Sequence, residues 1–262
     1  MCRLATYLGE PLFLEALIAT PRHSLMRQAL RAEEAVAVTN GDGFGIGWYG
    51  ERDEPGVYRE VMPAWSDDNL LALSRTLRSR LFFAHVRSAT AGGISRQNCH
   101  PFRHGRFLFM HNGQIGGYAQ LRRTLESQLP DDLYAQRRGG TDSELLFLLA
   151  MARVERGESM PKAMLAVLDE TLALMREHAI HPPLRFAAVL ADGQRLHAFR
   201  IASDGQPPTL YLRRSEAGHT IASEPLCDDE PGWQLLPVGA VVTLEGRRCE
   251  VTRHATGHAV PA

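Results

Sequence analysis

The second residue of the chain, Cys2, is the first candidate for chemistry. Met1 is normally removed when the following residue is small, which would leave Cys2 with a free α-amino group. An α-amino group titrates near ~7.7–8.0, so a useful fraction of it is unprotonated at neutral pH and able to take the thiol proton. Nucleophile and general base would then belong to one residue. A cysteine at position 2 indicates little by itself, so other polar motifs must support it.

Three such motifs follow apolar segments or open a helical pattern: Arg87 in AHVRSAT, Asn112 and Gly113 in HNGQ, and Asp142 in GTDSE. The fork of an arginine suits a carboxylate, although an internal ion pair is the structural alternative. An Asn amide and a Gly N–H can converge on one oxygen as an oxyanion hole, although Asn-Gly is also an ordinary turn. An aspartate at a helix start can hold a ligand ammonium group or simply cap the helix.

Together these residues match the functional groups of one kind of substrate. A free amino acid with an amide side chain presents a carboxylate, an ammonium group and a scissile carbonyl. Arg87 suits the carboxylate and Asp142 the ammonium group. Cys2, with Asn112 and Gly113, suits the carbonyl.

The elements around these residues predict how they are positioned. Strands are expected over 2–8, 81–88 and 107–111, and Thr141 with Glu144 forms a capping box that starts a helix near 142. Phe44, Ile46 and Trp48 alternate with glycines, which predicts a strand approached closely by another segment. Further helices are expected over 11–19 with Pro11 in its first turn, over 67–77 with Ser66 as cap, and over 116–128 and 161–178. Further short strands are expected over 185–192, 195–201, 209–213, 219–223, 239–245 and 248–253.

This order of strands, then helices, then strands favours an α+β fold with antiparallel sheets. No repeat or long linker divides the chain, so residues 1–262 are expected to form a single domain.

Composition excludes several classes of protein. Lys plus Arg is 29 and Asp plus Glu is 30, so the chain lacks the basic excess of nucleic-acid-binding proteins. No segment approaches the ~18 apolar residues of a membrane helix, and Glu10 and Pro11 interrupt any signal-peptide core. A cytoplasmic location is therefore expected. The four cysteines show no CxxC pair, so disulfides are not expected in that compartment.

Seven motifs together resemble those of the class II glutamine amidotransferases. They are Met-Cys at the start, DGFGIGWY at 42–49, AHVRSAT at 84–90, NCHPF at 98–102, HNGQI at 111–115, TDSE at 141–144 and ASEP at 222–225. The resemblance implies the N-terminal-nucleophile hydrolase fold, a four-layer αββα sandwich of two antiparallel sheets. It implies attack by Cys2 on a γ-glutamyl amide, release of ammonia or an amine, and hydrolysis of the thioester by water.

The same resemblance implies a role for each matching residue. Cys2 would be the nucleophile, with its own amine as the base. Asn112 and Gly113 would form the oxyanion hole. The residues implied to bind substrate are Arg87 for the α-carboxylate, Asp142 for the α-amino group, and His85 and Thr90 of the AHVRSAT motif. No metal or organic cofactor is implied.

The chain is too short to carry an ammonia-consuming synthase domain and resembles the stand-alone members of the family. Within them it is similar to the amidotransferase-like subunit of the fungal glutathione-degradation complex, through TPRHS at 20–24, ASEPL at 222–226 and related motifs. That similarity implies a small γ-glutamyl substrate and a metallopeptidase or synthase partner protein. A γ-glutamyl hydrolase of ergothioneine synthesis is a second relative. Gln114 departs from the fungal subunit, which leaves the substrate open.

Two other functions remain as alternatives. Cys99, His100 and His104, with His85 and His111, could bind a metal, although their spacing matches no standard zinc pattern. A non-catalytic scaffold that binds γ-glutamyl ligands is the second alternative. The intact set of candidate site residues argues against it.

Overall fold

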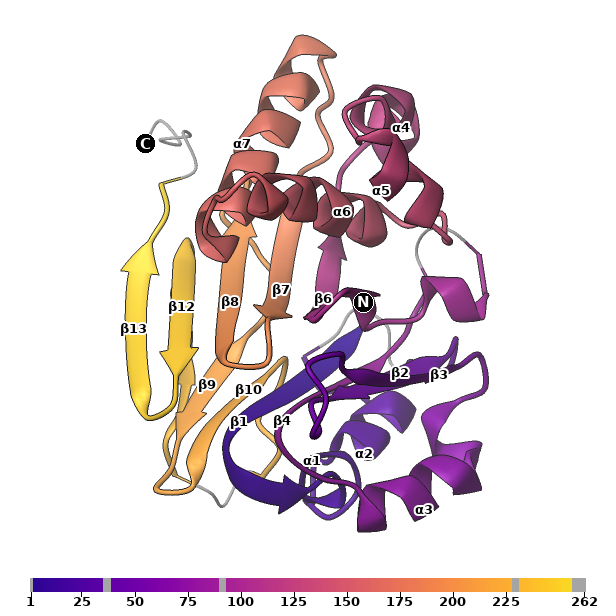
Figure 1. Cartoon of the computed structure of the whole chain (residues 1–262), viewed down its shortest axis with the longest axis vertical. Helices are drawn as coiled ribbons and strands as arrows, with labels where there is room; N and C mark the ends of the chain where they lie inside the picture. The colour runs from indigo at the N-terminus through magenta and orange to yellow at the C-terminus, as the bar shows by residue number, and fades with distance from the viewer. Residues whose placement is uncertain (1, 35–38, 90–92, 228–230, 256–262) are drawn as a thin grey trace.

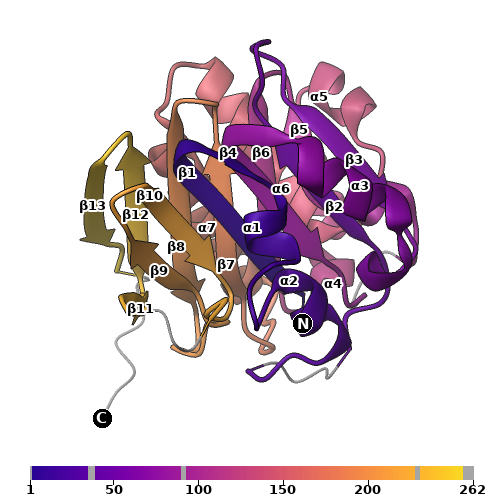
Figure 2. The same cartoon turned by 90° about the horizontal axis from the view of Figure 1, so that it is seen from below.

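The computed structural model describes residues 2–34, 39–89, 93–227 and 231–255. Two antiparallel sheets lie face to face, and helices cover the outer face of each, so the described chain forms four layers in the order α, β, β, α (Figures 1 and 2). The α+β fold with stacked antiparallel sheets expected from the sequence is confirmed.

The first sheet has seven strands in the order β11-β9-β10-β1-β4-β2-β3. Its strands are β1 (Arg3–Phe13), β2 (Phe44–Trp48), β3 (Gly56–Glu60), β4 (Arg78–Val86), β9 (Tyr211–Arg214), β10 (Gly218–Ala222) and β11 (Trp233–Leu235). Strand β1 lies in the centre, between β10 and β4. The second residue of the chain is therefore attached to the middle of this sheet.

The second sheet has six strands in the order β13-β12-β8-β7-β6-β5. Its strands are β5 (Phe102–His104), β6 (Phe107–Gln114), β7 (Arg185–Ala191), β8 (Arg195–Ala202), β12 (Ala240–Glu245) and β13 (Arg248–Arg253). Strand β6 of this sheet contacts β1 of the first, so the two strands that carry Cys2 and Asn112 belong to facing layers.

The helices divide between the two outer faces. Helices α1 (Glu15–Ile18), α2 (Leu25–Leu30) and α3 (Asp68–Thr76) pack on the first sheet. Helices α4 (Tyr118–Glu126), α5 (Asp131–Gln136), α6 (Asp142–Glu155) and α7 (Met160–Glu177) lie over the second (Figure 1). Two 3₁₀ turns cover Ala64–Ser66 and Arg96–Asn98. Helix α6 is apolar nearly all round because it lies between the second sheet and α7.

Most of the expected elements are present within a few residues of their expected bounds, and two local expectations were wrong. The segment 11–19 was expected to be one helix, but β1 continues to Phe13 and only Glu15–Ile18 is helical. Pairing of Leu12 with Ser79 beyond a bulge in β1 outweighs the helical pattern. The cap of α3 is Asp67, whose Oδ1 accepts from the Leu70 N–H at 2.8 Å, rather than Ser66.

The capping box before α6 is half formed. The Thr141 Oγ1 accepts from the Glu144 N–H at 3.2 Å, as expected, and the helix begins at Asp142. The Glu144 carboxylate accepts instead from the N–H groups of Arg138 and Gly139, at 3.0 and 2.7 Å. It therefore stabilises the loop before the helix and does not close the box on Thr141.

Candidate active site

Alternation along three strands directs the candidate residues into the space between the sheets. Leu4 of β1, Phe83 of β4 and Met110 of β6 belong to the core cluster that fills this space. Side chains two residues apart on a strand share a face. Cys2 precedes Leu4 by two residues, and Asn112 follows Met110 by two, so both extend the same inner layer. His85 and Arg87 likewise follow Phe83 at spacings of two and four residues.

Cys2 and Arg87 lie next to each other across the β1–β4 ladder. Arg3 pairs with Val86, so the next position of the ladder places Cys2 opposite Arg87. Arg87 extends β4 beyond its last residue, because its N–H donates to the Gly43 carbonyl at 2.8 Å and its carbonyl accepts from the Asp42 N–H at 3.0 Å. The Arg87 side chain is 3% exposed. A buried guanidinium is thus held beside the thiol.

The Cys2 thiol is enclosed by the turn after β4. Its Sγ donates to the Ser88 carbonyl and accepts from the Ser88 N–H, both at 3.5 Å. Burial raises the pKa of the Cys2 thiol, although the Ser88 N–H and the charges of Arg87 and Arg3 favour the thiolate. A thiol with a raised pKa is protonated at neutral pH, so it needs a base at the moment of attack.

Asn112 is 1% exposed, and neither its Oδ1 nor its Nδ2 has a hydrogen-bond partner among the described residues. Such an unpaired buried amide costs free energy and is rare in folded proteins. The next residue, Gly113, has φ of +151°, and a Cβ there would lie 1.9 Å from the Arg185 carbonyl oxygen. Only glycine fits at this position. The conformation of Asn112 and Gly113 is not that of the expected tight turn, since β6 continues to Gln114.

Asp142 is tied to the end of β6 by hydrogen bonds. Its Oδ2 accepts from the Ile115 N–H at 2.8 Å, and its Oδ1 accepts from the Ser143 N–H at 2.8 Å. The Ser143 hydroxyl is in turn 2.8 Å from His111 Nδ1. These contacts fix the orientation of the Asp142 carboxylate beside Ile115, which lies three residues along the chain from Asn112. The cap residue of α6 is Thr141, while the Asp142 carboxylate joins the first turn of the helix to the end of β6.

His85 packs against a second buried histidine. The rings of His85 and His100 lie 4.3 Å apart between centroids, and both residues are buried. Close approach of this segment explains a glycine of β2: a Cβ on Gly45 would lie 2.0 Å from the His100 carbonyl oxygen. This confirms the expectation that glycines in that strand mark a close neighbour. Thr90, the remaining candidate, lies outside the described residues.

Comparison with known protein families identifies the family of this chain. The family model described as glutamine amidotransferases class-II matches residues 20–215, well over half of the chain. The chain belongs to the class II glutamine amidotransferases. It is an enzyme, a cysteine amidohydrolase of the N-terminal-nucleophile type.

Similar proteins of known name and structure support the assignment. The Saccharomyces cerevisiae protein named probable glutamine amidotransferase DUG3 is 29% identical over 94% of this chain and 82% of its own length. The Mycolicibacterium smegmatis gamma-glutamyl-hercynylcysteine sulfoxide hydrolase is 29% identical over 96% of this chain and 99% of its own. A solved structure of a glutamine aminotransferase class-II domain protein from Silicibacter pomeroyi is 36% identical over 97% of this chain and all of its own, with a TM-score of 0.77.

More distant solved structures confirm the fold. The Bacillus subtilis glutamine phosphoribosylpyrophosphate amidotransferase matches 97% of this chain over 49% of its own, with a TM-score of 0.64 and 15% identity. At that identity the likeness shows the fold alone. The four-layer N-terminal-nucleophile hydrolase architecture expected for this amidotransferase is thus confirmed.

The metal-binding alternative finds no support in the arrangement of this amidotransferase. His104 is engaged by Gln136 and Glu155, at 2.9 and 2.8 Å, while the Cys99 Sγ contacts the carbonyl oxygens of Glu60 and Ser95 at 3.5 Å. Within the described ranges, no three His, Cys, Asp or Glu side chains gather so as to hold a metal ion.

Among the described residues, no helix is long and apolar enough to cross a membrane. All four cysteines are free.

Burial of the histidines makes the stability of the amidotransferase sensitive to acid. Burial lowers the pKa of His85 from 6.5 to about 3, so the unfolded chain takes up this proton at a higher pH than the folded chain. The stabilising contribution is therefore full above pH 6.5 and is lost as the pH falls from 6.5 toward 3. We expect His85 alone to reduce the free energy of unfolding by about 2 kcal/mol between pH 7.5 and pH 5.

Urea unfolding followed by circular dichroism at both pH values measures this loss. The variant His85→Gln should show a smaller loss than wild type, whereas a matched change at the exposed His178, His178→Gln, should leave the loss unchanged. An equal pH dependence in His85→Gln and wild type would contradict the prediction.

Several residues that contact the start of β1 were not assigned roles from the sequence. Arg3, Ser223 and Glu224 are buried at the start of β1 and in the segment after β10. The ASEP motif marked Ser223 and Glu224 as typical of the family, but no local pattern indicated what they contact. The contacts that Ser223 and Glu224 make with Leu4 and Arg3 span more than 200 positions of the chain, so sequence spacing could not reveal them.

Proposed function

We propose that this amidotransferase hydrolyses the γ-glutamyl amide bond of glutamine or of a γ-glutamyl compound through a thioester on Cys2. The observation that carries the proposal is the buried amide of Asn112, which has no hydrogen-bond partner in the described part of the chain and lies on the inner layer shared with Cys2 and Arg87. An amide held there is suited to donate to the oxygen of a substrate carbonyl.

The chemical steps follow from the thiol and its neighbours. Once Met1 is removed, the α-amine of Cys2 takes the thiol proton, because burial keeps that thiol protonated. The thiolate attacks the γ-carbonyl carbon, and Asn112 Nδ2 and the Gly113 N–H donate to the oxyanion. The intermediate collapses, and the amine leaves with the proton from the Cys2 ammonium group. Water then attacks the thioester, assisted by the same α-amine, and releases glutamate and the thiol.

Substrate recognition is assigned to the charged residues around the thiol. Arg87 forms two parallel hydrogen bonds with the α-carboxylate, and Asp142 accepts from the α-ammonium group. A carboxylate offers about four lone-pair sites, so Asp142 retains capacity beside the three protein hydrogen bonds that hold it. His85 and Thr90 remain proposed substrate-binding residues of the same motif.

The group beyond the γ-carbonyl is the open part of the substrate. The Mycolicibacterium smegmatis relative, named as a hydrolase of a γ-glutamyl compound, aligns over nearly its whole length, which supports simple hydrolysis by a single domain covering residues 1–262. The candidate substrates are glutamine, an ergothioneine precursor, and glutathione with a metallopeptidase partner. Transfer of ammonia would require a synthase partner. A cytoplasmic location remains a prediction.

Hydrolysis assays with purified protein lacking Met1 test the proposal. We expect release of glutamate from at least one of glutamine, glutathione and γ-glutamyl-hercynylcysteine sulfoxide, with no added metal. The α-methyl ester of the accepted substrate should be a poor substrate. Absence of turnover on all three free acids would favour the non-catalytic scaffold.

Arg87→Ala should weaken substrate binding by about ten- to a hundredfold, because a charge-assisted hydrogen bond contributes roughly 1.5–3 kcal/mol. The ester and the free acid should then be hydrolysed with similar kcat/KM by Arg87→Ala. Arg87→Lys should not restore binding, since an ammonium group cannot form the two-pronged contact. The exposed Arg75 provides the control Arg75→Ala. Equal hydrolysis of ester and acid by wild type would exclude Arg87 as the carboxylate-binding residue.

A further inference from the structure

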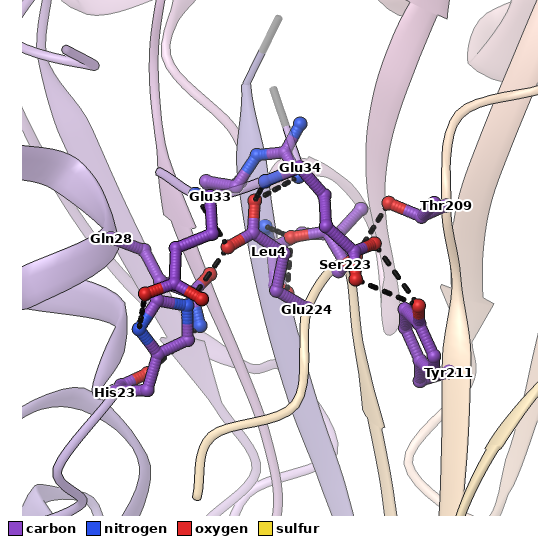
Figure 3. A network of polar contacts seen from close by, with 10 residues as sticks. Leu4, His23, Gln28, Glu33, Glu34, Thr209, Tyr211, Ser223 and Glu224 are labelled. Carbon is purple, nitrogen blue, oxygen red and sulfur yellow. Dashed lines mark hydrogen bonds and ion pairs between the residues drawn. The ribbon is translucent and has the colours of Figure 1, made fainter. Parts of the chain in front are cut away.

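The carboxylate of Glu224 joins three separate segments, namely the start of β1, His23 and the backbone of residues 33–34 (Figure 3). It is 1% exposed, and its Oε1 accepts from Arg3 Nη1 at 2.8 Å and from the Glu34 N–H at 2.9 Å. Its Oε2 lies 2.8 Å from His23 Nε2 and accepts from the Glu33 N–H at 3.1 Å. Although burial raises the pKa of Glu224, the hydrogen bonds from His23 and the two backbone N–H groups outweigh it and lower the pKa, so the group is ionised.

Arg3 depends on this carboxylate. Its side chain is 0% exposed, and its Nε and Nη2 have no hydrogen-bond partner among the described residues. The 2.8 Å ion pair with Glu224 is therefore what compensates a fully buried positive charge. Arg3 is the residue next to Cys2, so any displacement of Arg3 is transmitted to Cys2 through one peptide unit.

The neighbouring Ser223 fixes the following residue of the strand. Its N–H donates to the Leu4 carbonyl at 2.9 Å, and its Oγ accepts from the Leu4 N–H at 3.0 Å. The Ser223 carbonyl in turn accepts from the Thr209 hydroxyl at 2.8 Å (Figure 3). Residues 3 and 4 are thus each held by one residue of the segment 223–224.

These contacts occur where regular sheet pairing ends. On one side, the ladder with β4 continues to Arg3 and Val86. On the other side, the ladder with β10 ends at Ala5 and Ala222. Cys2, Arg3 and Leu4 therefore lie beyond the β10 ladder. Ser223 and Glu224 replace it on that side.

We propose that Glu224 is a positioning residue of this enzyme, which holds Arg3 and the 20–34 segment so that Cys2 presents its thiol and α-amine to the substrate carbonyl. This inference rests on the proposed function of Cys2. Glu224 touches neither substrate nor the reacting atoms. It acts through Arg3, and the other three contacts of its carboxylate prevent the pair from shifting.

The variant Glu224→Gln keeps the shape of the side chain and removes its charge. We expect kcat to fall by about a hundredfold, the loss associated with misplacement of a reacting group by about 1 Å, while KM changes by less than about threefold. The near-constant KM follows because Arg87 and Asp142, the proposed substrate-binding residues, do not contact Glu224.

Alkylation of Cys2 separates positioning from general loss of structure. Diazo-oxo-norleucine must bind as a glutamine analogue before it reacts, so its rate of attachment to Cys2 should fall in parallel with kcat in Glu224→Gln. Iodoacetamide needs no bound orientation, and its rate of reaction with Cys2 should be unchanged or faster, because Arg3 loses the carboxylate that offsets its charge near the thiol. Intact mass and peptide mapping locate each label on Cys2.

Two control variants reproduce the side effects of Glu224→Gln: one removes a negative charge elsewhere, and the other lowers stability. Glu158→Gln removes a carboxylate that pairs with Arg153 of α6, a helix over the second sheet. It should keep the kcat of wild type. Leu168→Ala creates a cavity in the buried face of α7, and should lower stability without changing kcat.

Three outcomes would overturn the proposal: wild-type kcat in Glu224→Gln, a fall in kcat that Leu168→Ala reproduces, or equal slowing of both alkylating reagents. Should Glu224→Gln not accumulate as folded protein, Ser223→Ala decides the question, because it removes one hydrogen bond to Leu4 and should lower kcat in the same direction by a smaller factor. Wild-type kcat in Ser223→Ala would then overturn it. Inactivity of wild type itself would refute the proposed function and not this inference.

Discussion

Replacement of Cys2 by alanine is expected to reduce turnover by on the order of 10⁴- to 10⁶-fold, the range seen when an enzyme loses its nucleophile. Cys2→Ser should also lose nearly all turnover, because a hydroxyl is far harder to ionise than a thiol at neutral pH. Both variants should fold, since the hydrogen bonds of the Cys2 thiol in the described structure are two weak ones to Ser88, each at 3.5 Å. Initial rates and circular dichroism measure the two expectations.

Labelling with diazo-oxo-norleucine identifies the nucleophile directly. Wild type should gain one label and Cys2→Ala none, as measured by intact mass. Among the other cysteines, burial raises the pKa of Cys99 to about 11, which keeps it an unreactive thiol. The half-buried Cys249 gives the matched control, Cys249→Ala, which should be labelled and active like wild type. A label on Cys99, Cys227 or Cys249 in place of Cys2 would move the reaction elsewhere.

Retention of Met1, or a tag fused before Cys2, should have the same effect as loss of the thiol. The nitrogen of Cys2 would remain an amide and could not take a proton. Intact mass of active protein should therefore lack Met1. Full activity in protein that keeps Met1 would refute the α-amine as base.

Asn112→Ala should lower kcat by on the order of a hundred- to a thousandfold, about 2.7–4 kcal/mol of transition-state stabilisation, with little change in KM. The amide is proposed to donate to an oxyanion that exists only during the reaction, so the ground-state complex loses little. The variant should not be strongly destabilised, because the Asn112 amide has no hydrogen-bond partner among the described residues.

Asn112→Asp tests the donor itself, since it keeps the size of the side chain and replaces the N–H donor by an oxygen. It should be at least as impaired as Asn112→Ala. Thr171→Ala truncates a buried polar side chain in α7 and should keep wild-type kcat, although it removes a 2.7 Å hydrogen bond to the Val167 carbonyl. A rise in KM at constant kcat in Asn112→Ala would show that Asn112 binds the ground state and is not an oxyanion donor.

Local patterns predicted the strands that carry the candidate residues, because alternation and turn chemistry act over a few neighbouring positions. The structure then places Leu4, Phe83 and Met110 in the inner layer, at even spacings from Cys2, Arg87 and Asn112. The start of α6 at Asp142 was predicted for the same reason, since a helix cap is formed by residues three apart. The helix expected over 11–19 was wrong where pairing between distant segments competed with a local preference.

The sequence by itself determined which residues could do chemistry and which strands or helix start they belong to, since both depend on neighbouring positions in the chain. Only the tertiary structure decided their surroundings: Asn112 is buried with no hydrogen-bond partner among the residues described, and Asp142 binds the backbone at the end of β6. It also decided what holds Cys2 in place, because Leu4 and Ser223 are 219 positions apart, and Arg3 and Glu224 are 221. Contacts over such separations arise only when the whole sheet closes, so no local pattern encodes them.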